Sequence, residues 1–537
     1  MSRAKKPKRI DLNQEEINAL MERVSNHQLR DDDYELIRAL IDTLRYLGES
    51  VDQKSQSIKK LLQMIFGSST ETKENIFGAM DKTKDNASDQ NEEDDPESPA
   101  GHGKNGADDY TGAEKICVDH ESLKSGDLCP KCGKGKVYEK KNPKILIRLT
   151  GNPPISGKIY ELQKFRCNLC GETFTAKAPE SVGEEKYDSR SVAMMVLLRY
   201  GTGMPLNRLE KLQNSLGIPL PASTQWETAK NNAHAFYPVM EWLLDLAAQG
   251  DIIHNDDTPA KILSLIKEIQ EKMKTAGHDP PHRKGMFTTG IVSKSDQWRI
   301  ALFATGRQHA GENLEALLKR RREETGPPIQ MCDGLSRNRP GDFEIILSNC
   351  LTHARRKFVD VIEKYPVECQ HVIDVFAKVY HNDAIAKKQN MSPEQRLGWH
   401  KQKSAHILDE LNTWMQELFD KKIIEPNSIL GNAIQYTQKR WLPLTLFLRK
   451  AGAPLDNNIC EQALKKVVLS RKNSYFYKTP NGARIADLFM SLIHTCELSG
   501  ADPFDYLTAI LDHRNHAEGR PSDWMPWNYT DTVGQLG

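Results

Sequence analysis

Short stretches with strand character follow one another between residues 251 and 331, and acidic residues come soon after the first and the fourth of them. Asp256 follows the first stretch and Asp333 follows the fourth. Each stretch is too short for an ordinary helix and is bounded by polar or turn-forming residues, which predicts a β-meander, a helix and a return strand. The expected elements are strands over 251–254, 285–293, 297–305 and 328–331, with a helix over 311–322.

This order of strands and helix is that of a ribonuclease-H-like sheet, in which the first and fourth strands are neighbours. Asp256 and Asp333 are therefore predicted to meet at one end of an α/β domain. A third acid is expected from a helix packed near those strand ends, and the candidate is Glu461 in the segment 456–461, Asp-Asn-Asn-Ile-Cys-Glu. Three carboxylates that share two Mg²⁺ (or Mn²⁺) ions form the clamp needed for in-line attack on a phosphodiester, because these ions prefer oxygen ligands.

Each acid also has a simpler interpretation when it is taken alone. Asn458 and Glu461 have the spacing of a helix capping box, with Asn458 as N-cap and Glu461 as the third helical residue. Asp333 before Gly334 is typical of a turn, and Asp256 of a polar strand end. The catalytic interpretation therefore depends on the joint placement of the three acids.

Two matching Cys-x-x-Cys-Gly turns precede this region. Turns of this kind aim two thiolates at one point, so together they supply the four sulfurs of a closed, structural Zn²⁺ site. The 34 residues between the turns include strand-like stretches over 144–149 and 159–165, which a zinc ribbon with an extended hairpin accommodates. A redox pair or reduced structural thiols are the alternatives, and the duplication of the turn favours zinc. The proposed ligands are Cys129, Cys132, Cys167 and Cys170.

The N-terminal region has heptad spacing. From Ile37 to Ile65, apolar residues recur alternately three and four positions apart, and only Lys54 interrupts the pattern. The pattern favours either a coiled coil that makes the protein a homo-oligomer or an amphipathic helix packed within one subunit. The following segment, 70–115, is acidic and almost without apolar periodicity, which predicts a disordered linker.

A helical pair is expected ahead of the first strand. Residues 206–216, Gly217 and 222–236 have the pattern of helix, turn and helix. Ser223 or Thr224 is predicted to cap the second helix. Such a pair is either a DNA-reading helix-turn-helix or a plain pair of packed helices.

The 128 positions from Asp333 to Glu461 exceed what one strand and one helix need, and 359–449 is rich in helical pattern. A helical insertion is therefore predicted there, and it could cover a DNA end. Basic residues on either side of it are candidates for phosphate contacts. Two of them have simpler interpretations: Lys465 as an ion-pair partner of Glu461, and His353 as a core histidine. These DNA-binding candidates are His353, Arg356, Lys357, Lys465, Arg471 and Lys472.

Length, composition and charge limit the number of domains, the partners and the location to be expected. A chain of 537 residues favours several domains, and 38% hydrophobic with 27% charged residues is typical of globular protein with some disordered length. The net charge of +1 gives no sign of a nucleic-acid partner, but the acidic segment 90–112 can hide basic runs elsewhere, each of which alone is typical of a solvated helix face. No apolar run approaches the roughly 20 residues of a membrane span, and no signal segment follows the basic start, so a cytoplasmic location and no membrane partner are expected.

The motifs around the acids resemble those of one known family. They are Asp256-Asp257-Thr258-Pro259, Cys332-Asp333-Gly334, His353-Ala-Arg-Arg-Lys-Phe358, Ile434-Gln-Tyr436, Asp456-Asn457-Asn458 with Glu461, and Arg471-Lys472-Asn473. From about residue 190 to residue 507, the sequence resembles the transposases of the insertion-sequence-66 family. It departs from the family's usual pattern at Asp257 (usually Glu), Gln462 (usually Arg) and Ser470 (usually Gly), all outside the proposed metal ligands.

The resemblance implies a transposase that cleaves DNA and transfers strands, with Asp256, Asp333 and Glu461 as its catalytic triad. It also implies DNA partners, namely terminal inverted repeats and target DNA, and companion proteins encoded by the same element. The alternatives are a non-catalytic zinc-ribbon DNA-binding protein derived from such an enzyme, and a ribonuclease-H-like nuclease. The expected regions are helical or coiled-coil (1–69), linker (70–115), zinc ribbon (116–180), helical (181–248), catalytic (249–358 and 450–512), helical insertion (359–449) and C-terminal tail (513–537).

Overall fold

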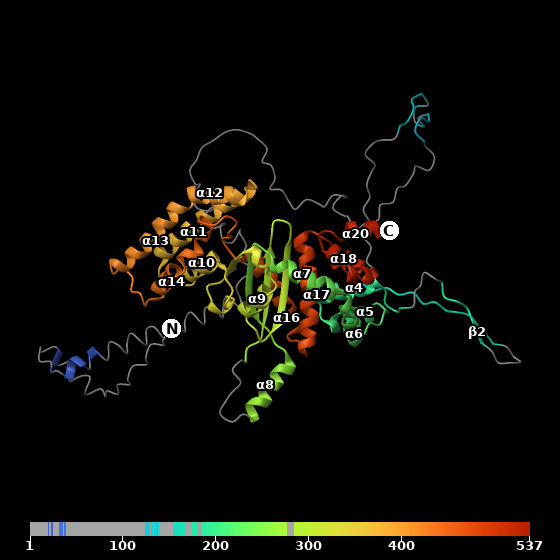
Figure 1. Ribbon diagram of the computed structural model, residues 1–537, viewed down its shortest axis with the longest axis horizontal. Helices are drawn as coiled ribbons and strands as arrows, with labels where there is room; N and C mark the ends of the chain where they lie inside the picture. Colours follow the sequence, from blue (N-terminus) through green and yellow to red (C-terminus); the bar gives the residue numbers. More distant parts are fainter. Residues whose placement is uncertain are drawn as a thin grey trace. The chain divides into compact units, whose positions relative to one another are not determined.

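The computed structural model describes residues 185–275 and 284–536 continuously. Before residue 185 it describes residues 20, 23–24, 30, 32–35, 37–38, 124–128, 130, 132, 134–138, 154–166 and 173–179. The chain divides into two compact units: a sheet unit (86–346 and 457–537) and a helical unit (1–85 and 347–456), whose elements are labelled in Figure 1. In the part of the chain that is described, no helix is long and apolar enough to cross a membrane.

A mixed five-stranded sheet with order β5-β4-β3-β6-β7 is the centre of the α/β architecture. β3, β4 and β5 are antiparallel neighbours, and β6 pairs with β3 in parallel. The predicted adjacency of the first and fourth strands, here β3 and β6, is therefore confirmed. The strands are β3 (Ile252–Pro259), β4 (Phe287–Lys294), β5 (Arg299–Gly306), β6 (Ile329–Cys332) and β7 (Ile346–Asn349).

Three details of the predicted order are corrected. β3 does not end before the acids but continues through Asp256 to Pro259, because its whole length pairs with β4. A helix that the sequence analysis did not predict, α8 (Leu263–Thr275), follows β3. The helix expected over 311–322 is α9 (Ala310–Leu318), which ends earlier than expected.

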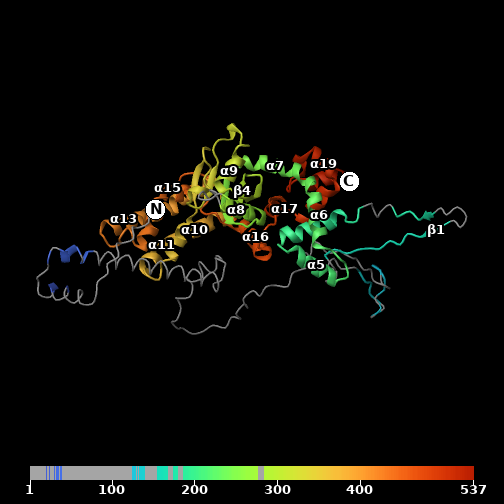
Figure 2. The ribbon, with the colours of Figure 1, turned by 90° about the horizontal axis from the view of Figure 1, so that it is seen from below.

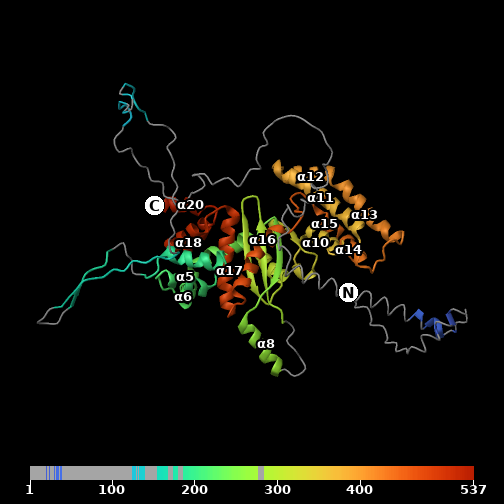
Figure 3. The ribbon, with the colours of Figure 1, turned by 180° about the vertical axis from the view of Figure 1, so that it is seen from behind.

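The outer edge of the sheet, β5, is covered by α17 (Pro480–Ser499), as Figure 3 shows. Side chains four residues apart on α17 accept hydrogen bonds from alternate backbone N–H groups of β5. Thr495 Oγ1 accepts from Ala301 N (3.1 Å), Ser491 Oγ from Phe303 N (2.9 Å) and Asp487 Oδ2 from Thr305 N (2.7 Å). One helix face thus replaces the missing neighbouring strand, so the edge is not open to pairing with another chain.

Asp487 makes this edge sensitive to pH. Its carboxyl group also accepts a hydrogen bond from Thr305 Oγ1 (2.6 Å), and burial raises its pKa to about 7. Because the pKa is raised on folding, this carboxyl stabilises the fold fully below about pH 4 and loses that contribution as pH rises through 7, a change of roughly 4 kcal/mol.

We therefore expect the free energy of unfolding to decrease less between pH 4 and pH 7 in Asp487→Asn than in the natural protein. Chemical denaturation at a series of pH values measures this difference. The exposed acid Asp512, changed to Asn, serves as the control and should follow the natural profile. Parallel profiles for all three proteins would contradict the assignment.

The rest of the sheet unit is helical. Its predicted helical pair is present as α5 (Leu206–Ser215) and α6 (Ala222–Asn232), and Gly217 with φ +75° lies in the turn. The predicted cap is wrong: Pro221 is the N-cap of α6 and makes no side-chain cap bond, because the helix already begins at Ala222.

The other elements are α4 (Ser189–Val196), the π-helix η3 (Leu197–Gly201), the 3₁₀ turn η4 (Ala233–Phe236), α7 (Tyr237–Ala248), α16 (Asn458–Ser474) and α18 (Pro503–Asp512).

Residues 513–536 are not a tail. They form α19 (Arg514–Gly519), the 3₁₀ turn η8 (Pro521–Trp524) and α20 (Tyr529–Leu536), which belong to the sheet unit. Trp524 is completely buried in its core, and Tyr506 donates a hydrogen bond to the Trp524 carbonyl oxygen (2.9 Å). Burial of large aromatic side chains contributes strongly to core stability, so the segment is part of the folded sheet unit.

The helical unit contains most of the predicted insertion. α11 packs against α10, α12 and α13, and Figure 2 shows it beside α10 and α13. Asp383 of α11 is buried among Arg396, Lys387 and His400. Their hydrogen bonds and charges outweigh burial and hold the pKa of the Asp383 carboxyl well below its usual range. The elements are α10 (Leu351–Val359), α11 (Pro366–Lys388), α12 (Pro393–Lys403), α13 (Ala405–Asp420), α14 (Ile429–Gln438), α15 (Trp441–Leu444) and the 3₁₀ turn η7 (Leu446–Leu448).

The structure describes little of the regions before residue 185. β1 (Lys164–Arg166) pairs antiparallel with β2 (Thr173–Thr175), and Leu128 forms an isolated antiparallel bridge with Lys136. These pairings flank the two cysteine turns, and Cys132 is exposed. Cys129, Cys167, Cys170, the linker 70–115 and nearly all of the heptad region lie outside the described residues.

Candidate active site

Asp256 and Asp333 lie at the same level on neighbouring parallel strands. In the register of β3 and β6, His254 is opposite Met331, and each acid comes two residues later. Asn338, at the end of the 3₁₀ turn η6 (Ser336–Asn338), donates from Nδ2 to Asp333 Oδ1 (2.6 Å) and to Asp256 Oδ1 (3.2 Å). One amide nitrogen therefore lies within hydrogen-bond reach of both carboxylates.

The electrostatics of Asp256 reflect this proximity. Burial raises the pKa of Asp256 to about 7, and the negative charges of Asp333, Asp257 and Glu461 add to the increase. The hydrogen bond from the Asp257 backbone N–H (2.8 Å) acts in the opposite direction and lowers this pKa. The site thus gathers negative charge in a place with little solvent, which is an arrangement that a cation relieves.

Asp257 is used differently. Successive residues of a strand point to opposite faces, and the Asp257 side chain, only 1% exposed, pairs with His309 Nδ1 (2.9 Å) and Arg337 Nη2 (3.3 Å). Its carboxylate therefore already has two partners of its own, neither of which contacts Asp256 or Asp333 in the bonds described above. Because the two side chains point to opposite faces of the strand, Asp256 lies at the Asn338 amide that it shares with Asp333, and Asp257 lies in a separate polar cluster.

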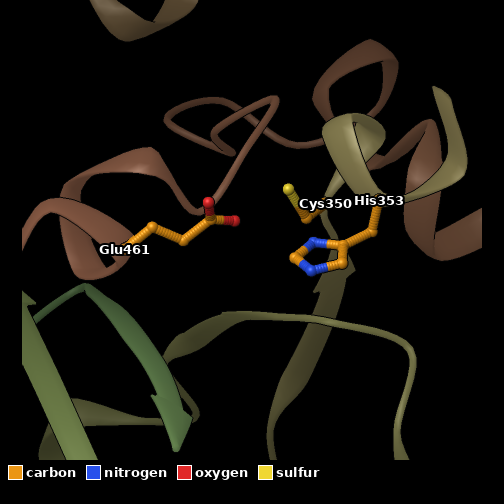
Figure 4. A group of neighbouring side chains, drawn as sticks. All are labelled: Cys350, His353 and Glu461. Atoms are coloured by element: carbon orange, nitrogen blue, oxygen red, sulfur yellow. The ribbon is translucent and has the colours of Figure 1, made fainter. Parts of the chain in front are cut away.

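Asn457 anchors the start of α16, from which Glu461 projects in the first turn (Figure 4). Asn457 is fully buried and donates from Nδ2 to the Asn255 carbonyl oxygen (3.2 Å), which leaves Oδ1 to accept from His254 Nδ1 (3.1 Å). Burial lowers the pKa of His254 to about 4, so the ring is neutral at neutral pH and its Nδ1 carries the donated proton. Two bonds from one side chain thus fix α16 on β3.

This geometry corrects the capping-box interpretation. The N-cap of α16 is Asn457, not Asn458, and it makes no side-chain cap bond because its amide is bound to β3. Glu461 is consequently the fourth residue of the helix, beyond the third position that a capping box requires. Capping therefore does not explain the presence of Glu461.

A glycine lets α16 approach the sheet closely. Gly290 on β4 lies directly opposite Asp256, and the Cys460 thiol donates to its carbonyl oxygen (3.3 Å). A Cβ atom at Gly290 would lie 3.0 Å from two side-chain carbons of Leu464, tighter than ordinary packing. The absence of a side chain at Gly290 therefore determines how near the helix that carries Glu461 lies to the strand that carries Asp256.

The phosphate candidates on α16 differ in whether they already have hydrogen-bond partners in the protein. Lys465 and Lys472 are exposed and available to a ligand. Arg471 instead donates to Thr258 Oγ1 (3.1 Å) and to the Pro259 carbonyl oxygen, and so binds the end of β3. Part of its predicted phosphate-binding capacity is thus used to hold the strand.

The remaining phosphate candidates belong to α10 in the helical unit. His353 follows Cys350 by one turn (Figure 4), and Arg356 is half-buried. Lys357 is exposed, with Nζ 5.3 Å from the centre of the Tyr436 ring, and the Arg440 guanidinium lies 4.1 Å from the same ring. Within this unit, a cationic surface thus surrounds an aromatic side chain.

Sequence reasoning missed three contributors to this site: Asn338, Asn457 as an anchor, and Gly290. Asn457 lay within a motif that was noticed, but no local pattern distinguishes the other two. Their roles arise from contacts between distant positions, such as the 82 residues that separate Asn338 from Asp256.

A comparison with protein families completes the description of the site. Residues 185–485, which include all three acids, match the model of the Transposase IS66 family. The chain belongs to this family. This transposase-family chain is similar to proteins of Sinorhizobium fredii that are described as uncharacterized. The protein y4jD is 26% identical over 69% of this chain and 72% of its own length, and y4qI is 23% identical over 79% of this chain and 74% of its own length. A third, y4hP, is 24% identical over 68% of this chain and 67% of its own.

Proposed function

We propose that the protein is a DNA transposase that cleaves and joins DNA at the ends of an insertion sequence through Asp256, Asp333 and Glu461. The observation that carries the proposal is the convergence of Asp256 and Asp333 on one amide nitrogen at the ends of adjacent parallel strands. The strand order, with β6 parallel to β3, supports a ribonuclease-H-like catalytic domain. Membership in a transposase family supports DNA as the substrate.

The donors of this site suit a hard divalent cation. Asp256 and Asp333 offer carboxylate oxygens, the ligands that Mg²⁺ and Mn²⁺ prefer, and Glu461 adds a third carboxylate. We propose that these three residues hold two such ions. When bound, the ions would activate the attacking oxygen and neutralise the charge on the leaving oxygen.

The other residues of the site position these acids. Asn338 holds the carboxylates of Asp256 and Asp333 at a fixed separation, and Asn457 fixes the helix that carries Glu461. Lys465 and Lys472 are exposed, and we propose that they contact phosphates of the DNA backbone, which would keep the strand in register. Catalysis in this proposal comes from orientation and electrostatics, without a covalent protein intermediate.

A strand-transfer assay tests the proposal. Purified protein, element ends and a target plasmid are incubated with Mg²⁺ or Mn²⁺, and cleaved and joined products are separated on gels. We expect both products, and we expect neither in the presence of a chelator. Binding of the element ends without cleavage in either ion would instead support a non-catalytic DNA-binding protein, and cleavage without joining would support a nuclease.

We further propose that Cys129, Cys132, Cys167 and Cys170 hold a structural zinc ion, and that the heptad region makes the protein a homo-oligomer. Terminal inverted repeats, target DNA and companion proteins of the same element are the proposed partners. Joining two DNA ends in one complex is easiest with linked subunits.

For the zinc site, Cys132→Ser should lower the zinc content of purified protein while the sheet unit stays folded, because a closed site needs all four thiolates. Metal analysis gives the zinc content, and circular dichroism with thermal unfolding reports on the fold. The buried Cys369→Ser is a control that should retain zinc. Absence of zinc from the natural protein, prepared without chelator, would contradict the site.

A further inference from the structure

A basic pocket lies at the far end of α16, where this helix meets the end of β3. It is a small pocket that is partly open to solvent. Its lining includes the three cations Arg199, Lys261 and Arg471, but no carboxylate. The pocket therefore gathers positive charge with no acid in its lining to neutralise it.

The cations of the pocket have donors to spare. Within the described residues, none of the three forms an ion pair with a carboxylate. Arg199 donates to Ser470 Oγ (3.4 Å) and Arg471 to the end of β3, but a guanidinium has five N–H donors, so several stay available to each. Lys261 is exposed. The pocket therefore has the charge and the donors that bind a phosphodiester.

Two aromatic side chains stand at the same pocket. Tyr475 is 70% exposed and Phe476 is 48% exposed, and both line the pocket. Exposed neighbouring aromatic rings are unusual on a protein surface unless they bind something, and a nucleic-acid base stacks on such rings. Phosphate-binding cations beside stacking surfaces are the combination that binds a single nucleic-acid strand.

The backbone at Tyr475 supports a functional role. Tyr475 ends α16 with φ +61°, a value that is costly for a bulky non-glycine residue. Such conformations persist where the surrounding structure enforces them and cluster at binding sites. Here Tyr477 N donates to the Lys261 carbonyl oxygen (2.8 Å) and Leu263 N to that of Tyr477 (2.9 Å), so the segment after Tyr475 is bound to the chain that follows β3.

The pocket is close enough to Asp256 to act on the same DNA strand. Pro259, which lines the pocket, is three residues beyond Asp256 on β3, a separation of about 10 Å at 3.3 Å per residue. A strand stacked as in a duplex, with a rise of about 3.4 Å per nucleotide, spans this distance in roughly three nucleotides, and a more extended unpaired strand needs fewer. The acids and the pocket can therefore engage neighbouring parts of one strand.

We propose that this pocket binds one unpaired DNA strand, with a phosphate on Arg199, Lys261 and Arg471 and a base stacked on Tyr475 or Phe476. The inference deepens the proposed function, since it concerns the strand on which Asp256, Asp333 and Glu461 would act. It is nevertheless a statement about binding, and it can be tested without catalysis.

Photocrosslinking tests the position of the base. The full-length Asp256→Asn protein, in chelator, is irradiated with an oligothymidylate that carries one iodouracil, and crosslinked peptides are identified by mass spectrometry. We expect the crosslink at Tyr475 or Phe476. Tyr475→Gly relieves the strained φ, so the fold should persist while the crosslink yield falls several-fold, and Tyr475→Phe should retain it because the ring remains.

The salt dependence of binding tests the phosphate contact. Lys261→Gln should weaken oligothymidylate binding and reduce the slope of log affinity against log salt by about 0.7, the share of one phosphate contact. Lys319→Gln, which removes an exposed lysine from the opposite end of the sheet, should leave the slope unchanged.

Crosslinks confined to other peptides, together with natural affinity in Tyr475→Gly and Lys261→Gln, would overturn the proposed pocket. Failure of the strand-transfer assay would not affect this result, because the crosslink is measured without divalent ions and in a variant that lacks the Asp256 carboxylate. Conversely, active strand transfer with no crosslink at Tyr475 or Phe476 would leave the catalytic proposal standing and remove only this one.

Discussion

Replacing Asp256 by asparagine should reduce DNA cleavage and joining by orders of magnitude, while folding and binding of DNA ends persist. The amide has nearly the shape of the carboxylate, and its oxygen can still accept from Asn338 Nδ2, so the local hydrogen bond is retained. What is lost is the negative charge of a carboxylate that we propose to be a metal ligand. Strand-transfer gels and a parallel gel-shift assay measure the two properties separately.

The matched control is the adjacent Asp257→Asn. Asp257 pairs with His309 and Arg337, so its replacement should lower the melting temperature but reduce strand transfer far less. Both variants change one carboxylate to an amide on the same strand, and only the face of the sheet differs. An inactive Asp257→Asn together with a nearly normal Asp256→Asn would show that the first metal ligand has been assigned to the wrong residue.

Gly290→Val should impair strand transfer by about a hundredfold without unfolding the protein. The first added carbon would lie 3.0 Å from Leu464, so α16 must shift outward and carry Glu461 away from Asp256. Overpacking of this kind costs roughly 1–3 kcal/mol in stability. A displacement of about 1 Å at a reacting centre is enough for a hundredfold loss of rate.

Gly306→Val on the neighbouring strand β5 is the control, because a Cβ atom at Gly306 meets nothing within 4 Å. This variant should unfold and transfer strands as the natural protein does. Thermal unfolding and the strand-transfer assay compare the two substitutions directly. Normal activity of Gly290→Val would mean that the position of Glu461 does not depend on the close approach of α16 to β4.

Local patterns were sufficient for four of the five strands of the sheet. The alternation of short apolar stretches and turn residues predicted the ends of β3, β4, β5 and β6 to within a few residues, except that β3 continues further than expected. The order of these strands predicted that β3 and β6 pair. It did not predict β7, α8 or the covering of β5 by α17. The ladder of Asp487, Ser491 and Thr495 is hard to detect in a sequence because its partners lie more than 180 positions away.

The sequence by itself determined the family to which the chain belongs and the strand order that brings Asp256 and Asp333 together, and it singled out three candidate acids. Period-two and period-3.6 patterns depend on near neighbours, so they can be read along the chain. Only the tertiary structure decided that Asp256, not Asp257, shares an amide with Asp333, and that Asn457 and Gly290 set the position of Glu461. Those roles depend on packing between residues far apart in the chain, which no local pattern encodes.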